Sequence, residues 1–446
     1  MGLFIKGVFV LASTAFIGEC IEFLINLVLA RELGEYGLGQ YMTILPFVAL
    51  IMILSSMELP ISISKFIAER ERKFHLPLLK LAVKLVVILI IILSILSFFL
   101  FTIFDVFTSI HPFANWVVII LIPIVSLSSI ARGYFLGVQR MGKIAVANLF
   151  RRGLQLFFLV LIFSQLDLSI DQSVLIAICS IVVGELFEFL FLFSAYFFQI
   201  RDLKKEIPGK LPKTVLAKSL LTVSLPTTGM RIFHAFSHAV QPILIKFSLV
   251  TGGLSFSSAT EHFGRLAGVA FPIGFFPAFM AHSIMTALIP SVSKAYAKKD
   301  QVQLLMLLKN VIKLTAAYGI PVCIGLYAFP ETFTKLFVES KEAADYLRLL
   351  WPYFFLHYFS IPLQGFLIGL GLLKDALFHH IWSTCITFFL MYFLGSNPLF
   401  LMDGIIIGMN TGAVLLMALH YFTICKKIGV SFTLTRQHPL LSHTRK

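Results

Sequence analysis

The sequence predicts an all-α polytopic membrane protein with about twelve transmembrane helices. Of its 446 residues, 58% are hydrophobic and only 13% are charged, which is about half the charged share of a soluble domain. Apolar runs of about 20 residues, the length that crosses the hydrocarbon core of a bilayer, recur along the whole chain. In lipid such long runs form helices, because each backbone polar group must find its hydrogen-bond partner within the segment.

Charge clusters or turn residues bound each apolar run, and these boundaries give the expected spans. They are residues 6–30, 41–64, 81–106, 116–138, 144–165, 172–198, 219–247, 262–290, 311–330, 348–370, 379–396 and 402–424. The glycine-rich stretch at 34–39 lacks the strand and helix context of a dinucleotide-binding loop, so it predicts a tight turn between the first two spans.

Lys and Arg indicate how the chain is oriented. Most of the 36 Lys and Arg residues fall in segments that share one side of the membrane, and the acids Asp105, Asp167, Asp171 and Asp403 lie in loops on the other side. Cytoplasmic loops carry the excess of Lys and Arg in membrane proteins. We therefore expect an even number of spans with both termini in the cytoplasm.

The sequence argues against several kinds of chemistry. The net charge of +14 is spread over short loops, where topology and anionic membrane lipids account for it, so we expect no nucleic-acid partner. The five cysteines have no disulfide or zinc spacing. A phosphate-binding loop ending in Gly-Lys-Ser or Gly-Lys-Thr and a nucleophile elbow are both absent from the sequence. We predict no metal, no cofactor and no catalytic residue, and therefore not an enzyme.

Two short motifs recur at an offset of about 230 residues, which indicates an internal repeat. Ser-Ile-Ser-Lys at 62–65 resembles Ser-Val-Ser-Lys at 291–294, and Gly-Tyr-Phe-Leu-Gly at 133–137 resembles Gly-Phe-Leu-Ile-Gly at 365–369. Six helices in each half give both halves the same orientation, related by a pseudo-two-fold axis along the membrane normal. The expected organisation is a six-helix lobe at 1–198, a cytoplasmic linker at 199–218, a second six-helix lobe at 219–425 and a basic cytoplasmic tail at 426–446.

Residues 30–40 (ARELGEYGLGQ), 60–65 (PISISK) and 132–137 (RGYFLG) resemble the stage V sporulation protein B branch of the polysaccharide exporters. That branch belongs to the multidrug, oligosaccharidyl-lipid and polysaccharide exporter superfamily. The resemblance covers most of the chain and implies two six-helix lobes in a V around a central cavity. It also implies movement of a lipid-linked saccharide by alternating access across the bacterial plasma membrane, in cell-wall formation or in a spore or forespore membrane.

Acidic residues at membrane depth are the candidates for ion coupling, because each is costly in lipid and usually faces the protein interior. Glu19, Glu22 and Asn26 fall within about 60° of arc in the first span. Glu185 and Glu188 are three residues apart in the sixth span and are neighbours on its surface. Hydrogen bonding between helices of one lobe is the alternative role of these acids. If they couple transport, the coupling ion is H⁺ or Na⁺.

A second polar stripe indicates a substrate cavity. Thr227, Arg231, His234, His238 and Gln241 fall within about 80° of arc in the seventh span. Arg231 lies near the midplane and is the expected anion contact, because a guanidinium stays charged and binds phosphate or carboxylate through two hydrogen bonds.

Each of these cavity residues has an alternative role. A structural ion pair with Glu19 or Glu185 is the alternative for Arg231, and hydrogen-bonded packing is the alternative for His234 and His238. Arg265 is a further cavity candidate, although Glu261 is spaced to form a local helix ion pair with it.

Three function hypotheses follow from these features. The first is a flippase whose partners are membrane lipids and a lipid-linked saccharide or related amphiphile. The second is a cation-coupled exporter of small organic compounds, like the multidrug branch. The third is a non-transporting membrane factor in spore-envelope formation. The charge of the cavity separates the first two, since a phosphorylated headgroup requires cations and a cationic drug requires acids.

Overall fold

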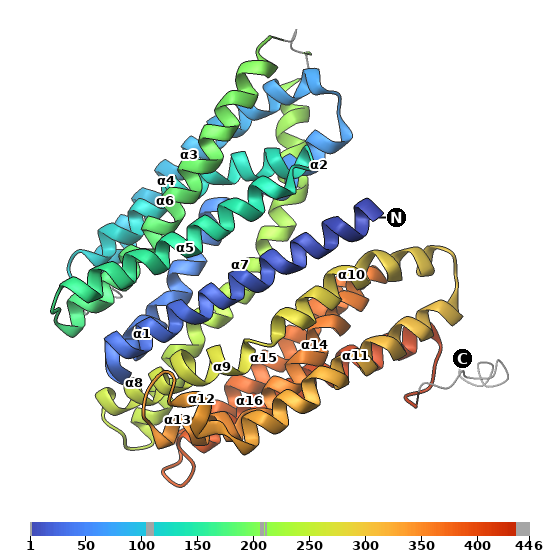
Figure 1. Cartoon of the computed structure of the whole chain (residues 1–446). Coiled ribbons are helices and arrows are strands. Elements are labelled where there is room, and N and C mark those ends of the chain that lie inside the picture. Colours follow the sequence, from blue (N-terminus) through green and yellow to red (C-terminus); the bar gives the residue numbers. More distant parts are fainter. Residues whose placement is uncertain (1, 104–110, 206–208, 210–211, 434–446) are drawn as a thin grey trace. The chain divides into compact units, whose positions relative to one another are not determined.

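A computed structural model describes residues 2–103, 111–205, 209 and 212–433. Side chains are described from Phe16 onwards, except at several positions between 213 and 230. Every long element is a helix (Figure 1). The contacts divide the chain into two compact units, Met1–Ile243 (unit 1) and Leu244–Lys446 (unit 2).

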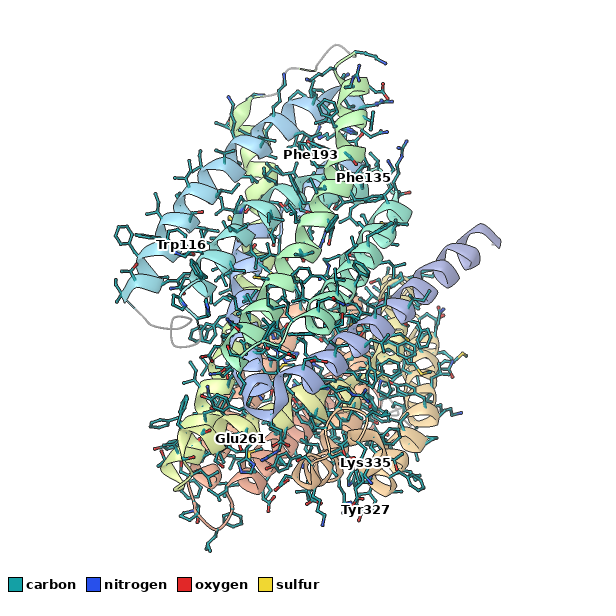
Figure 2. The ribbon with its side chains drawn as sticks, turned by 60° about the vertical axis from the view of Figure 1, so that its left-hand side comes forward. Trp116, Phe135, Phe193, Glu261, Tyr327 and Lys335 are labelled. Atoms are coloured by element: carbon teal, nitrogen blue, oxygen red, sulfur yellow. The ribbon has the colours of Figure 1, made fainter. Side chains whose placement is uncertain are left out.

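Unit 1 holds the first six α-helices and most of the seventh. They are α1 (Gly2–Ser56), α2 (Leu59–Glu69), α3 (His75–Ile103), α4 (Ala114–Gly137), α5 (Met141–Gln165), α6 (Ile170–Leu203) and α7 (Lys213–Thr251), with a short 3₁₀ turn at Arg72–Phe74. Phe135 near the end of α4 and Phe193 on α6 lie at one end of the unit, and Trp116 at the start of α4 lies toward the other (Figure 2).

Two breaks interrupt the first helical segment of unit 1. At Gly34 the backbone leaves the helical region, with φ 63° and ψ −179°, a conformation that glycine adopts without steric cost. Residues 35–56 continue as helix, so the break between the first two helical stretches falls in the stretch 34–39, where the turn is expected, and is confined to Gly34. The second break lies at Met57 and Glu58, whose φ angles are 43° and 49°. It follows from Pro60, whose ring clashes with the carbonyl of Ser56 in a continuous helix.

Unit 2 combines long helices with short ones that gather at one end of it (Figure 1). The elements are α8 (Phe256–Gly264), the π-helical turn η2 (Arg265–Ala270), α9 (Phe271–Phe275), α10 (Ala278–Ala297), α11 (Gln301–Ala328), α12 (Pro330–Thr334), α13 (Lys341–Leu349), α14 (Trp351–Gly369), α15 (Leu373–Gly395) and α16 (Met402–Ile428). Glu261, Tyr327 and Lys335 lie at the end that carries α8, α12 and α13 (Figure 2).

The length and composition of the helices make the chain a multi-pass membrane protein. Among the described residues, eight helices are long and apolar enough to cross a bilayer, and the bent pair of Phe256–Phe275 and Ala278–Ala297 makes a ninth. One of the eight, Phe16–Glu69, has 54 residues, more than twice the length of a single crossing. It covers two of the expected spans. The expected total of twelve stays a prediction.

Small residues allow the helices to pack closely, as membrane helices require when lipid removes the hydrophobic drive between them. A Cβ on Gly133 of α4 would lie 2.9 Å from the Pro60 Cα of α2. In unit 2, a Cβ on Gly369 of α14 would lie 2.8 Å from the Val292 Cβ of α10. Gly404, Gly408 and Gly412 of α16 have similar close contacts with α15.

The two units share their order of helix packing. In unit 1, α2 packs on α4, α3 on α4, α4 on α6 and α5 on α6. In unit 2, α10 packs on α14, α11 on α14, α14 on α16 and α15 on α16. The paired motifs of the sequence lie on corresponding helices, with Ser62 on α2 and Ser291 on α10, and Gly133 on α4 and Gly365 on α14. This correspondence supports an internal repeat.

The contact between α2 and α4 generates the first prediction. Gly133→Ala should lower the free energy of unfolding by about 1–3 kcal/mol, because the added methyl group overpacks against the backbone of α2. A drop in the thermal unfolding midpoint of the detergent-solubilised protein measures the loss. Gly142→Ala, where the new Cβ meets nothing within 4 Å, is the matched control and should keep the wild-type midpoint. Equal midpoints for both variants would contradict a close contact at Gly133.

Candidate functional site

A cluster of two buried acids and two half-buried arginines joins three helices of unit 1. Glu188 of α6 is fully buried and accepts a hydrogen bond from Arg132 of α4. Its second carboxylate oxygen lies 3.3 Å from Arg151 Nε of α5. Arg151 Nη1 also lies 3.5 Å from Glu185 of α6, one turn earlier. Two positive and two negative charges therefore neutralise one another where α4, α5 and α6 meet.

A glycine positions this cluster. A Cβ on Gly184 of α6 would lie 2.9 Å from the Arg151 carbonyl oxygen, so only glycine lets α5 approach α6 this closely. Arg151 lies ten residues into α5, which starts at Met141. At 1.5 Å per residue that is about 15 Å along the helix. At this depth an arginine without a partner is costly, and the glutamates supply the compensating charge.

A second cluster lies between α1 and α5. Arg152 Nη1 is 3.3 Å from Glu19, and Arg152 Nε is 3.5 Å from Glu22. Gly18 makes room for the guanidinium, because a Cβ there would meet Arg152 Nη1 at 3.0 Å. Asn26 donates a hydrogen bond to the Glu22 carbonyl oxygen. The structure thus brings Glu19, Glu22 and Asn26 together on one face, as the sequence predicts, and adds Arg152.

Arg231 of α7 forms an ion pair with Glu58, the residue at the break between α1 and α2. The Arg231 side chain is 57% exposed, whereas that of Glu58 is 7% exposed. The alternative considered from the sequence, an ion pair with Glu19 or Glu185, does not match this arrangement. Left-handed backbone at non-glycine residues costs about 1–2 kcal/mol each. The break at Met57 and Glu58 therefore stores strain at the point where the carboxylate meets Arg231.

A cavity of about 290 Å³ in unit 1 opens beside this ion pair. Residues of α1, α2, α4, α6 and α7 line it, together with Glu58 at the break. Its polar lining consists of Ser56, Glu58, Ser128, Ser129, Arg132, Glu185 and Arg231. Two guanidinium groups therefore face the cavity, and each is already engaged by a glutamate. Such a site can bind an anion, which takes the place of a glutamate carboxylate at one of the arginines. It can also bind a proton on a glutamate carboxylate, which then releases its arginine.

The other residues of the α7 stripe lie on the same helix as Arg231. Arg231 and His238 are exposed, and His234 and Gln241 are half-buried. His234, His238 and Gln241 are not among the residues that line the cavity. Thr227 falls outside the residues whose side chains are described. Their predicted role in substrate binding therefore stays a prediction.

Arg265 lies in unit 2, in the π-helical turn after α8. Its guanidinium is 3.9 Å from Glu261 and 3.4 Å from His262 Nδ1, which matches the local ion pair considered from the sequence. His262 Nδ1 is 2.6 Å from the Tyr346 hydroxyl of α13. Burial raises the pKa of Tyr346, so the phenol stays protonated. Its O–H donates a hydrogen bond to His262 Nδ1. This cluster joins the short helices at one end of unit 2.

Three arginines and one acid of these clusters are not among the residues predicted from the sequence. Arg132, Arg151 and Arg152 lie near the ends of expected spans, where Lys and Arg belong to the cytoplasmic excess of positive charge, and Glu58 is not among the candidates. Depth in the membrane is the sequence signal that points to these arginines. Arg151 and Arg152 fall inside an expected span, and α6 carries two acids that need counter-charges. The pairing of Glu58 with Arg231 had no sequence signal, since it depends on how a broken helix packs against α7.

Comparison with known proteins identifies the family. Residues 4–296, more than half of the chain, match the family model described as polysaccharide biosynthesis protein. The chain belongs to this family. Residues 265–393 match a second model, described as MatE. The resemblance seen in the sequence is confirmed.

Two curated relatives of this family member come from Bacillus subtilis (strain 168). The chain is 46% identical over 435 residues to the sporulation protein YkvU, covering 98% of both chains. It is 28% identical over 440 residues to the stage V sporulation protein B, covering 96% of this chain and 85% of the relative. The polysaccharide biosynthesis protein described here is therefore related to sporulation proteins along nearly its whole length.

Solved structures show the same fold at low sequence identity. An inward-facing multidrug resistance MATE family transporter of the MOP superfamily matches with a TM-score of 0.72 and 17% identity, over 92% of this chain and 94% of that one. A MOP superfamily transporter from Pyrococcus furiosus matches with a TM-score of 0.62 and 18% identity, over 95% of both chains. This polysaccharide biosynthesis protein has a MATE-like fold.

The cluster around Glu188 predicts how its members respond to substitution. Glu188→Gln should lower the free energy of unfolding by about 2–4 kcal/mol, because it leaves two half-buried arginines short of a counter-charge. Adding Arg132→Met should restore part of the loss, since it removes one of those charges. Glu71→Gln is the control, because Glu71 pairs with Lys73 in an exposed position and such pairs contribute little. Thermal unfolding compares the variants, and a Glu188→Gln midpoint equal to that of the control would contradict the pairing.

Proposed function

We propose that this transporter-family protein is a flippase for a lipid-linked saccharide or a related amphiphile with an anionic headgroup. The observation that carries this proposal is the cavity of unit 1, where Arg132 and Arg231 both border the space. A phosphate or diphosphate group needs fixed cations that can offer paired N–H donors, and guanidinium groups provide them. The sequence alone had offered mainly Arg231 for this role.

The ion pair between Arg231 and Glu58 supports a coupling mechanism. An incoming anionic headgroup replaces the Glu58 carboxylate at Arg231. Glu58 is then a buried carboxylate without its counter-charge, which is costly unless a proton accompanies the headgroup. One anion and one proton therefore bind together. Glu185 borders the same cavity and is the second coupling candidate, whereas Glu19 and Glu22, with side chains 40% and 43% exposed, belong to the separate Arg152 cluster.

The wider organisation is part of the same proposal. Two like-oriented six-helix lobes at 1–198 and 219–425, joined by the 199–218 linker, alternate access to a central site, and both termini are cytoplasmic. The repeated order of helix packing supports this organisation, and repeated lobes are common in transporters that work by alternating access. The sporulation proteins YkvU and stage V sporulation protein B support a role in the bacterial plasma membrane or forespore membrane during spore-envelope formation.

A second candidate function is cation-coupled export of a small organic compound. Glu58 and Glu185 in the same cavity favour it, because acids bind cationic compounds. The two candidates predict opposite consequences at Glu58. Removal of the acid weakens binding of a cationic compound and strengthens binding of an anionic headgroup.

Transport through the cavity can be measured with the full chain in proteoliposomes and a fluorescent polyprenyl-diphosphate-linked saccharide. Arg231→Gln should slow the movement of this lipid across the bilayer by about 10- to 100-fold, the loss expected for a charge-assisted hydrogen bond. Arg231→Lys should retain part of the activity, because an ammonium keeps the charge and loses the paired geometry. Arg140→Gln, at an exposed position, is the control and should match the wild type.

The pH dependence of binding has a definite sign in this mechanism. Wild-type affinity for the lipid should rise as pH falls, because headgroup binding is linked to proton uptake by Glu58. Glu58→Gln should bind more tightly at neutral pH and lose this dependence. If the double variant Arg231→Gln with Glu58→Gln recovers wild-type movement, the pair is structural and the substrate role of Arg231 is wrong.

A further inference from the structure

Three histidines meet between α15 and α16 in unit 2, at a place that the proposed transport site does not use. His379 Nδ1 of α15 lies 3.0 Å from His420 Nδ1 of α16. His379 Nε2 lies 3.1 Å from the Thr423 hydroxyl. The ring of His380 is 5.6 Å from that of His420, and His420 is fully buried. These three histidines are called the histidine cluster below.

Hydrogen-bond chemistry fixes the protonation of the central pair. A neutral imidazole has one N–H donor and one acceptor nitrogen, so the contact between the two Nδ1 atoms needs one ring to donate and the other to accept. His420 Nε2 is buried and has no hydrogen-bond partner among the described residues. A proton on it would be an unsatisfied buried donor, which is costly. His420 therefore donates from Nδ1 to His379, and its Nε2 holds a lone pair.

Few charges from the packed elements face the histidine cluster. Asp375, half-buried one turn before His379 on α15, acts electrostatically on that ring. The other titratable neighbours on α16, Tyr421 and Cys425, are neutral in their ordinary forms. Lys374, Lys426 and Lys427 on the two helices are exposed.

The helices packed against α15 and α16 add no compensating charge. The buried face of α14 is apolar around Leu363, Phe366 and Leu367, and Lys309 and Lys313 of α11 are exposed. The charged residues of α13 lie by the other end of α16, where Asn410 donates a hydrogen bond to the Leu349 carbonyl. Asp375 is therefore the one acid near the cluster in the part of the chain that the structure describes.

The internal repeat gives an independent reason to single out His420. The offset that relates Gly133 of α4 to Gly365 of α14 also relates Glu188 of α6 to His420 of α16. Both residues are fully buried, and each is the centre of the polar contacts that join its helix to the preceding one. The same position in the repeated fold therefore carries a titratable group in both units.

We propose that His379, His380 and His420 form a proton-binding site of unit 2 that ties α15 to α16 when empty and loosens them when filled. A proton from water adds to the lone pair on His420 Nε2. Among the described residues, the imidazolium that results has half-buried Asp375 as its one acidic neighbour. Because an uncompensated buried charge is unfavourable, α15 and α16 part to admit water, and the site transmits pH to helix packing.

Hydrogen–deuterium exchange of the full chain in lipid nanodiscs tests this site. After correction for intrinsic exchange rates, residues 373–383 and 420–428 should exchange about tenfold faster at pH 5.5 than at pH 7.5. The opened form binds one proton at a histidine with the ordinary pKa of about 6.5. Below this pH, each pH unit shifts the opening equilibrium tenfold toward the open form. His420→Asn keeps a polar group at the Nδ1 position but takes up no proton, and it should show no such change.

His282→Asn is the matched control, because His282 is an exposed histidine on α10, and it should respond to pH as the wild type does. Where His420→Asn does not insert into the membrane, His420→Gln is the second variant; it also removes the titratable nitrogen and should show the same loss of response. A wild-type exchange rate that does not change with pH overturns the proposal. So does a tenfold response that persists in the His420 variant that inserts.

Discussion

Charge pairing at membrane depth is the constraint on which the structure of unit 1 depends. A charged side chain at the centre of a membrane helix costs about 2.5–3.5 kcal/mol on insertion scales, and arginine cannot escape this cost by losing its proton. Glu188 offsets it for Arg132 and Arg151 at once. Because these residues come from three helices, the pairs also decide that α4, α5 and α6 are neighbours and set their rotation.

The backbone makes these pairs reachable. Gly184 lets α5 approach α6 where Arg151 meets the acids, and Gly18 does the same for α1 and Arg152. Pro60 interrupts the helix before α2, and the interruption turns Glu58 toward Arg231. Glycine and proline, which are both unfavourable inside ordinary helices, therefore allow these costly charges to be paired.

The sequence predicts the helical, multi-pass class because apolar length is a local property that any window of about 20 residues displays. It identified Glu19, Glu22, Glu185 and Glu188 because acids inside apolar runs are rare. It could not predict their partners. The positive-inside rule assigns Arg132, Arg151 and Arg152 to the cytoplasmic side by their nearness to a span end, whereas their pairing with acids depends on how α4 and α5 are rotated against their neighbours. The partner of Arg231 depends on a helix break whose direction no local pattern encodes.

The two units use one order of helix packing for different chemistry. At the position where unit 1 buries Glu188 against arginines, unit 2 buries His420 against His379. An arginine–glutamate pair carries both charges, so another anion can compete with the carboxylate for the arginine. A histidine pair is neutral and changes when a proton arrives, so it responds to pH. The same order of helix packing therefore carries a centre of paired charges in unit 1 and a centre of paired histidines in unit 2.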